Sequence, residues 1–121
     1  MTGIRRALAA LAASAAAWAT AAHAQVASFD CRQAQTETEW AICNTPELGA
    51  LDVEMAATYR LLSDLAPDSS RLARQAGQSQ AAWIRGKRNA CGGDVGCLSR
   101  EYRQHISQLR ELARKSFVLR P

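Results

Sequence analysis

Catalytic motifs are scarce in this 121-residue sequence. Histidine occurs only at His23 and His105, and the chain has neither a Gly-x-Ser-x-Gly elbow nor a His-Glu-x-x-His pair. Paired carboxylates such as Glu37 and Glu39 lie two residues apart, which places them on different faces of a helix and makes them poor acid/base partners. These absences argue against an enzyme and favour a binding protein.

Cysteine motifs for metals and redox chemistry are also absent. The sequence has Cys31, Cys43, Cys91 and Cys97, so eleven and five residues separate the members of the two local pairs. Structural zinc sites place paired ligands about two to four residues apart, and thioredoxin-like sites need Cys-x-x-Cys. We therefore expect neither a metal nor another cofactor.

The first 24 residues have the composition of a secretory signal peptide. Two arginines precede an alanine- and leucine-rich run, and the tripeptide Ala22-His23-Ala24 forms a small-x-small cleavage site. The apolar run is shorter than the ~20 residues that a membrane-spanning helix needs, and no lipobox cysteine follows the site. We expect a signal peptide over residues 1–24 and a periplasmic or secreted domain over residues 25–121, without a stable membrane anchor after cleavage.

All four cysteines fall in the predicted mature domain. An even number of cysteines in a small exported domain indicates two disulfides, although the sequence alone leaves their connectivity open. We favour the local pairs Cys31 with Cys43 and Cys91 with Cys97, because they need no long rearrangement of the chain. Each bridge would stabilise the thin core of such a domain by roughly 2–3 kcal/mol through loop-closure entropy.

Helix signals follow one another along the mature chain. Thr36 and Glu39 form a capping box that starts a short helix reaching Cys43. The tripeptide Asn44-Thr45-Pro46 then supplies a stop, an N-cap and a first-turn proline, so a second helix is expected to begin at the proline. Its apolar stripe recurs at steps of three and four and consists of Leu48, Leu51, Met55, Tyr59, Leu62 and Leu65.

Two further helices are expected after a break at residues 66–70. The first spans about residues 70–90, where Gly77 and Gly86 each lower helix stability by about 1 kcal/mol relative to alanine, so its existence is better supported than its straightness. Its core-facing residues are Leu72, Ala76, Trp83 and Ile84. The second has an apolar stripe at the same steps of three and four, which consists of Val95, Leu98, Tyr102, Ile106, Leu109 and Leu112.

These elements predict an all-α fold. We expect a small antiparallel helical bundle of three main helices, with the short N-terminal helix packed over one end and two disulfides as staples. Tyr59, Trp83 and Tyr102 occur at helical spacing, which favours core aromatics with a polar tip at the rim over a ligand-binding box. A lone helical histidine such as His105 is expected at the surface or at the edge of the core.

Charge is divided unevenly between two halves of the domain. Residues 25–68 hold eight acidic and two basic residues, whereas residues 69–121 hold eleven basic and three acidic residues. The overall surplus is small, so a nucleic-acid partner is not expected. The favoured interpretation is that neighbouring helices attract each other through their solvated faces, and the alternative is a polar face offered to a charged partner.

One charged pair is predicted to stabilise the fold. Asp52 follows Leu51 on the inner edge of the second helix, and Arg88 lies near the end of the third. Antiparallel packing of these helices would bring Asp52 and Arg88 into a structural ion pair that is costly to break from one side.

The heptapeptide CGGDVGC at residues 91–97 encloses three glycines between two cysteines. Gly92 and Gly93 suit the left-handed turn that ends a helix, and Asp94 suits the N-cap of the next one. We therefore favour a disulfide-locked helical corner. The alternative is a binding finger around Asp94, because a preorganised loop binds a partner at lower entropic cost.

Five segments follow one another along residues 28–110, namely SFDC, EWAIC, PELGALDVEMAATY, QAAWIRGKRNAC and CLSREYRQHISQL. They contain all four cysteines. This ordered set resembles the LprI-like family, the N-terminal domain of lysozyme inhibitor LprI, which was formerly a domain of unknown function. The resemblance implies an extracytoplasmic, mostly helical protein that binds and inhibits lysozyme-type muramidases.

Lysozyme is therefore the first candidate for a protein partner. Many lysozymes are cationic, so charge complementarity favours the acidic half of the domain as the docking face. The candidate partner-binding residues are Glu37, Glu39, Glu47, Glu54 and Asp94.

The alternative function is a periplasmic interaction module without inhibitory activity. Arg103, Arg110 and Arg114 share one face of the last helix, which suits an anionic envelope component or another protein. The sequence does not indicate an oligomeric state.

Overall fold

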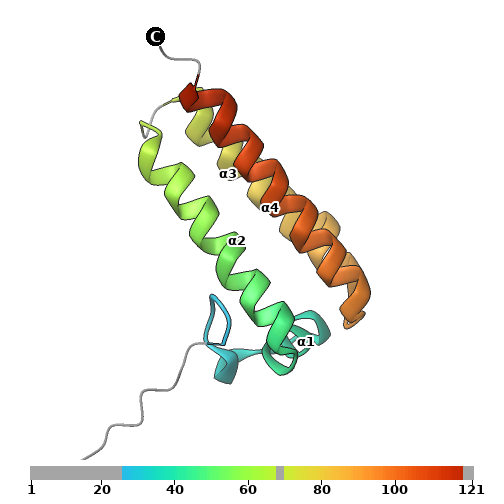
Figure 1. The fold of residues 1–121 in the computed structure, drawn as a ribbon. Helices are drawn as coiled ribbons and strands as arrows, with labels where there is room; N and C mark the ends of the chain where they lie inside the picture. The colour runs from blue at the N-terminus through green and yellow to red at the C-terminus, as the bar shows by residue number, and fades with distance from the viewer. Residues whose placement is uncertain (1–25, 68–69, 119–121) are drawn as a thin grey trace, which may run out of the picture.

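The computed structural model describes residues 26–67 and 70–118 of the chain, and every regular element within them is helical (Figure 1). The elements are η1 (Cys31–Gln33), α1 (Glu37–Asn44), α2 (Pro46–Leu65), α3 (Arg71–Trp83), the π-helical η2 (Ile84–Arg88), η3 (Asn89–Cys91) and α4 (Val95–Val118). None of these helices is both long and apolar enough to cross a membrane. The predicted signal peptide lies outside the described residues.

The bundle is built from α2, α3 and α4, which run alternately up and down (Figure 1). The side-chain pairs between α2 and α4, Glu47 with Arg103 and Glu54 with Arg110, both join residues 56 positions apart. A constant separation means that α2 and α4 run in the same direction, with α3 antiparallel to both. The short α1 packs against the start of α2 at one end of the bundle. The predicted antiparallel succession of three main helices is therefore confirmed.

Helix starts follow local signals in the sequence. At α1, the Thr36 hydroxyl accepts a hydrogen bond from the Glu39 amide, and the Glu39 carboxylate accepts one from the Thr36 amide, each at 3.1 Å. This reciprocal pair is the predicted capping box. At α3, the Ser70 hydroxyl accepts a hydrogen bond from the Ala73 amide at 3.0 Å. Both contacts satisfy amides that have no partner within their own helix.

A single residue separates α1 from α2. The second helix begins at Pro46, as predicted, but the Thr45 side chain makes no capping hydrogen bond. The Thr45 amide instead donates to the Ala41 carbonyl at 3.0 Å and closes α1. The proline that follows has no amide hydrogen, so one of the donors that a cap would satisfy is already missing.

The third helix is the least regular one. Its α-helical part ends at Trp83, and the chain continues through η2 and η3 until Gly92, whose φ of 56° ends the helical run. This conformation is favourable for glycine and strained for other residues, so the predicted stop at Gly92 is confirmed. Gly86 lies within η2, in the part of the helix whose straightness the sequence left in doubt.

The core lies along the middle of the bundle. Trp83 and Tyr102 meet edge to face, with ring centroids 5.1 Å apart. Both are buried, as predicted, but the Tyr102 hydroxyl lies inside the core and not at its rim. The other large buried apolar side chains are Ile42, Leu48, Leu51, Met55, Leu62, Leu98, Ile106 and Leu109.

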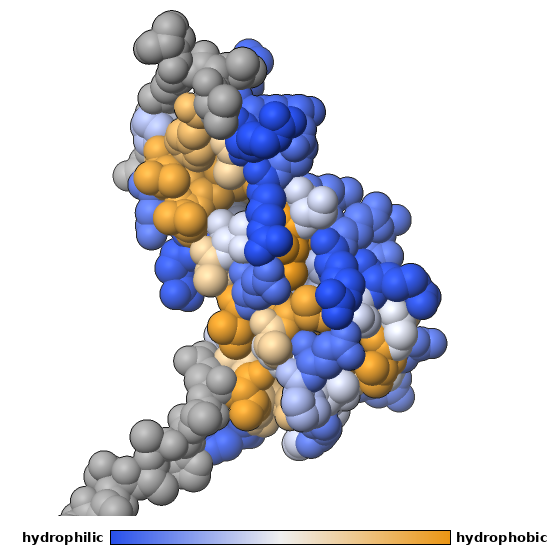
Figure 2. All heavy atoms as spheres, viewed as in Figure 1, coloured by the Kyte–Doolittle hydropathy of each residue, from blue (hydrophilic) through white to orange (hydrophobic). Residues whose placement is uncertain are grey.

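Three residues depart from the predicted burial pattern. Leu65 and Val95 are 55% and 42% exposed, because they lie in the terminal turns of α2 and α4, where packing is incomplete. Figure 2 shows hydrophobic side chains at this end of α2, where Leu61 is also exposed. His105, which was expected at the surface or at the edge of the core, is fully buried and stacks on the Trp83 ring at a centroid distance of 4.1 Å.

Two disulfides join Cys31 to Cys43 and Cys91 to Cys97, as predicted. The first ties the segment before α1 to the end of that helix, and the second closes the turn between η3 and α4. The segment before α1 also lies close against Gly49 of α2, because any side-chain carbon at this position would overlap the Val26 carbonyl.

Candidate functional site

The start of α1 and the turn before α4 come together at one end of the bundle. We call this surface the disulfide end and define it by Glu37, Trp40 and residues 92–95. The two segments are joined by a hydrogen bond that the buried Thr38 hydroxyl donates to the Gly92 carbonyl at 2.8 Å. Because each segment also carries a disulfide, its backbone is constrained before any partner binds.

The turn at residues 92–95 is the predicted disulfide-locked corner. Gly92 supplies the left-handed residue, and one Asp94 carboxylate oxygen accepts a hydrogen bond from the Cys97 amide at 2.8 Å. A side-chain carbon placed on Gly92 would lie 3.4 Å from the Glu37 carboxylate, so the turn and α1 are close neighbours. Asp94 therefore caps α4, while its position at the disulfide end leaves a role in recognition open to test.

The disulfide end exposes an aromatic side chain beside an unpaired carboxylate. Trp40 is 51% exposed and lies one helical turn after Glu37, on the same face of α1. Among the described residues, the Glu37 carboxylate has no hydrogen-bond or ion-pair partner. Tryptophan is enriched among the residues that dominate protein interfaces, so this surface has the chemistry of a protein-binding site.

The other predicted docking acids are engaged within the fold. Glu47 accepts hydrogen bonds from Arg103 at 2.7 Å and from the Ser99 hydroxyl, and the Arg103 guanidinium holds the pKa of Glu47 below its usual range. Glu54 pairs with Arg110 two turns further along the two helices. These bridges confirm the interpretation that the acidic and basic halves attract each other through solvated helix faces.

Glu39 is committed to its own helix. Its carboxylate accepts hydrogen bonds from the amides of Gln35 at 2.7 Å and Thr36 at 3.1 Å, and these bonds hold the pKa of Glu39 below its usual value. The five predicted partner-binding acids therefore do not form one face. The structure brings Glu37 close to Gly92 and Gly93 in the turn that carries Asp94, and it places Glu47 and Glu54 along the contact between α2 and α4.

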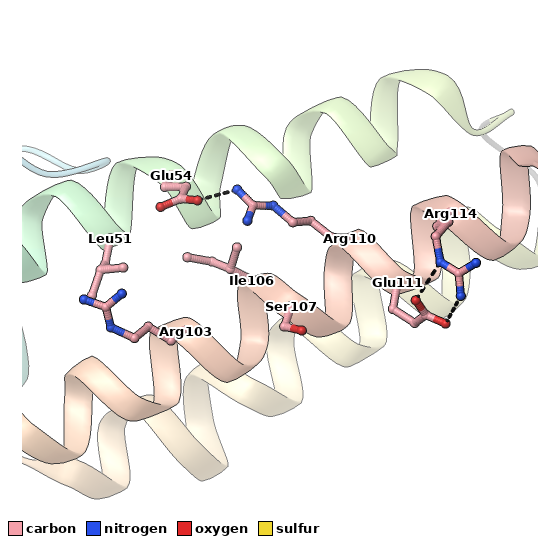
Figure 3. A pocket seen from close by; sticks show the side chains of 8 residues that line it. All are labelled: Leu51, Glu54, Arg103, Ile106, Ser107, Arg110, Glu111 and Arg114. Atoms are coloured by element: carbon pink, nitrogen blue, oxygen red, sulfur yellow. Dashed lines mark hydrogen bonds and ion pairs between the residues drawn. The ribbon is translucent and has the colours of Figure 1, made fainter.

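A shallow groove of about 620 Å³ runs between α2 and α4 (Figure 3). Leu51 and Ile106 form its floor, and the predicted arginine face forms one rim. Each arginine of that face already has an acidic partner: Arg103 has Glu47, Arg110 has Glu54 and Arg114 has Glu111. The groove therefore offers little free positive charge to an anionic envelope component.

The predicted ion pair between Asp52 and Arg88 is wrong. Asp52 is fully buried, and its carboxylate accepts hydrogen bonds from the Ser28 amide at 2.6 Å and the Tyr102 hydroxyl at 2.7 Å. Arg88 donates from Nε to the Asn89 side chain and forms no ion pair among the described residues. Two uncharged donors satisfy Asp52, because the segment before α1 brings an amide that helix packing alone does not supply.

The environment of Tyr102 links Asp52 and Arg88 indirectly. Burial and the adjacent Asp52 carboxylate raise the pKa of Tyr102 far above its usual value, so it stays protonated and donates to Asp52. The Arg88 guanidinium lies near enough to the Tyr102 hydroxyl to act in the opposite direction. The expectation therefore located Arg88 in the correct region but assigned it the wrong partner.

Sequence reasoning missed two features of the site. It assigned Trp40 only to the short helix, although Glu37 and Asn44 lie three residues before and four residues after it, and two polar neighbours at this spacing indicate an exposed face. It also gave Ser28 no role, because a backbone amide leaves no mark on the side-chain pattern.

The comparison with protein families covers most of the chain. A family model described as lysozyme inhibitor LprI matches residues 30–120, which include both disulfides, the disulfide end and all the described helices. No curated protein and no solved structure matches the chain significantly. Because the family match spans well over half of the sequence, the chain belongs to the LprI family of lysozyme inhibitors.

Proposed function

We propose that this protein binds a lysozyme-type muramidase outside the cytoplasm and inhibits it. The observation that carries the proposal is the family match over residues 30–120. Two disulfides and the absence of a free cysteine suit an oxidising compartment such as the periplasm or the exterior of the cell. Residues 1–24 would direct the chain there and be removed after Ala24.

The disulfide end is the proposed docking surface. Trp40 would supply apolar contact area, and Glu37 would face a lysine or arginine on a cationic lysozyme. Asp94 would add a second carboxylate beside Glu37. Glu47 and Glu54 would contribute less, because each already pairs with an arginine of α4.

Inhibition would follow from steric exclusion of the substrate. Muramidases hydrolyse long glycan strands and use a pair of carboxyl groups that flank the bond to be cleaved. A rigid protein surface placed over the substrate cleft blocks a polymer without contributing any chemistry of its own. This mechanism needs no catalytic residue or cofactor in the inhibitor.

A lysis assay tests the proposal directly. The purified protein is titrated into a suspension of bacterial cell walls with a cationic lysozyme, and the rate of clearing is followed. We expect saturable inhibition, and binding that weakens by at least about tenfold for Trp40→Ala, as is typical of interface hot spots. Leu61→Ala is the matched control, because Leu61 is 61% exposed on α2, away from the disulfide end.

Two variants that replace a carboxylate with an amide test the electrostatic contribution to binding. Glu37→Gln should weaken binding, most clearly at low salt, whereas Asp64→Asn, which removes an exposed carboxylate from α2, should not. The melting temperature of each variant is measured to show that the fold is intact. No inhibition at micromolar excess over a panel of lysozymes would remove the proposed function, and inhibition that Trp40→Ala leaves unchanged would remove the proposed surface.

A further inference from the structure

The side of α2 that faces away from the core is apolar. Ala50, Val53, Ala57 and Leu61 follow one another there at steps of three and four, so they share one face of the helix. All four are exposed, Val53 to 42% and Leu61 to 61%, and Leu65 continues the row into the last turn. Figure 2 shows apolar side chains along this part of α2. We call these five residues the α2 stripe.

The outer sides of the other two long helices are polar. Arg103 and Arg110 are exposed on α4, and Arg71, Gln75 and Gln78 are exposed on α3. A helix at the surface of a small domain normally carries polar and charged residues opposite its core face, whereas a helix that is apolar on both sides is normally buried. The composition of α2 therefore indicates that its outer side is covered by another surface.

The two edges of the α2 stripe carry opposite charges. Glu47 and Glu54 lie on the edge beside α4, and their side chains remain 56% and 44% exposed although each pairs with an arginine of α4. Arg60 lies on the other edge, beside Ser28 of the segment before α1. It forms no ion pair or hydrogen bond among residues 26–67 and 70–118. One face of α2 thus has both an acidic edge and a basic edge.

We propose that the α2 stripe is the contact surface of a twofold homodimer in which the two α2 helices run parallel. In this arrangement the acidic edge of each copy lies beside the basic edge of the other, so Arg60 faces the acidic edge of the second copy. Antiparallel helices would instead place like edges together. A second copy fits the stripe because the same surface supplies both charges.

The shape of the stripe favours the same pairing. A hollow of about 120 Å³ lies on its basic edge, where Val53, Ala57 and Arg60 contribute to the lining. Leu61 follows Ala57 by one turn, and the side chains of a helix lean toward its N-terminus. In the parallel dimer Leu61 of one copy therefore lies toward the hollow of the other. Each copy supplies one protruding side chain and one hollow, as a twofold interface requires.

The interface is small. The stripe runs from position 50 to position 65, which is about 22 Å of helix. Contact through one pair of such helices belongs at the low end of interface sizes, below about 1,200 Å². We therefore expect a weak dimer that exchanges with the monomer. Because the two helices run in the same direction, both disulfide ends lie at the same end of the dimer.

One charge at the end of the stripe opposes this pairing. Asp64 is exposed and follows Ala57 by seven residues, so it lies in line with Ala50 and Ala57. Parallel helices bring the two copies of Asp64 near each other. Asp64→Asn should therefore strengthen the association, most clearly at low salt.

Sedimentation equilibrium at increasing protein concentration tests the dimer. We expect the average mass to rise from that of a monomer toward that of a dimer. Ala57→Glu places two carboxylates against each other at the centre of the stripe and should weaken the association at least about tenfold, whereas Ala82→Glu on the exposed side of α3 should not. Arg60→Glu should weaken it at least about fivefold, and Arg85→Glu on η2 is its matched control.

Cysteine cross-linking tests the direction of the helices. Ala50→Cys and Ala57→Cys are made separately and treated with a short cross-linker that is specific for thiols. In a parallel dimer each position faces its own copy, so both variants should give cross-linked dimers. In an antiparallel dimer at most one position can lie at the twofold axis. Ala82→Cys is the control for random collisions.

Several results would overturn the inference. These are a monomer at every concentration, a dimer that Ala57→Glu leaves intact, or cross-linking at only one of the two α2 positions. Lysozyme inhibition lost in Ala57→Glu while the original protein is monomeric would assign the stripe to the muramidase instead. The dimer does not rest on the proposed function, because its formation by a protein that inhibits no lysozyme would remove that function and leave this inference standing.

Discussion

Removing the Tyr102 hydroxyl would test how the fold stabilises a buried charge. Tyr102→Phe keeps the ring that packs on Trp83 and removes the 2.7 Å hydrogen bond to Asp52. The fully buried carboxylate would then keep the Ser28 amide as its donor. A hydrogen bond to a charged group contributes about 1.5–3 kcal/mol, and a buried acceptor left without its partner costs about the same. We therefore expect Tyr102→Phe to lower the free energy of unfolding by about 2–3 kcal/mol.

Thermal and urea unfolding measure this loss. In a domain of this size each kcal/mol changes the melting temperature by about 4–8 °C, so a decrease of more than about 8 °C is expected. Tyr59→Phe is the matched control, because the Tyr59 hydroxyl has no hydrogen-bond partner among residues 26–67 and 70–118. Its free energy of unfolding should change by less than about 0.5 kcal/mol.

The same reasoning ranks two acids of α2. Asp52→Ala should destabilise the protein more than Glu54→Ala, because the buried Asp52 carboxylate accepts two hydrogen bonds within the fold, whereas Glu54 forms a surface bridge worth about 0–1 kcal/mol. Equal small losses for these two variants, or equal losses for the two tyrosine variants, would refute the view that a satisfied buried carboxylate stabilises the bundle.

Two other predictions concern burial and close approach. Burial lowers the pKa of His105, so as pH falls the unfolded chain takes up a proton at this residue before the folded chain does. The free energy of unfolding should therefore decrease below about pH 6.5, by up to about 1.4 kcal/mol per pH unit. Urea unfolding at several pH values measures this dependence, and His105→Gln should flatten it. Gly49→Ala should cost about 1–3 kcal/mol because its methyl group would overlap the Val26 carbonyl, whereas Gly86→Ala, with open space around it, should change stability by less than about 1 kcal/mol in thermal unfolding.

Features set by a few neighbouring residues could be predicted from the sequence. The capping box of Thr36 and Glu39, the start at Pro46, the stop at Gly92 and the cap at Asp94 each depend on contacts within about four positions. The disulfide pairing could also be predicted, because both bridges join nearby cysteines in the chain.

Features that depend on the packing of distant segments could not be predicted. The partners of Asp52 come from 24 residues before it and 50 residues after it, so the spacing of α2 and α3 alone suggested Arg88 instead. His105 is buried because Trp83 and Gln80 of the neighbouring helix provide a ring to stack on and a hydrogen-bond partner at 2.6 Å. The acidic residues appeared as one face in the sequence, but helix packing separated those beside α4 from those at the disulfide end.

The connectivity of the disulfides has a consequence for the order of folding. Each bridge closes a small covalent ring, because its two cysteines are only 12 and 6 positions apart in the sequence, and neither ring encloses α2 or α3. Oxidation therefore needs contacts only between residues that are neighbours in the chain, and it can be complete before α2, α3 and α4 assemble. Closing short loops costs less entropy than closing long ones, so the correct bridges are also those that form first in a newly exported chain. Both disulfides remain when the bundle opens. Each refolding event therefore begins from a chain in which disulfides between distant cysteines are already excluded.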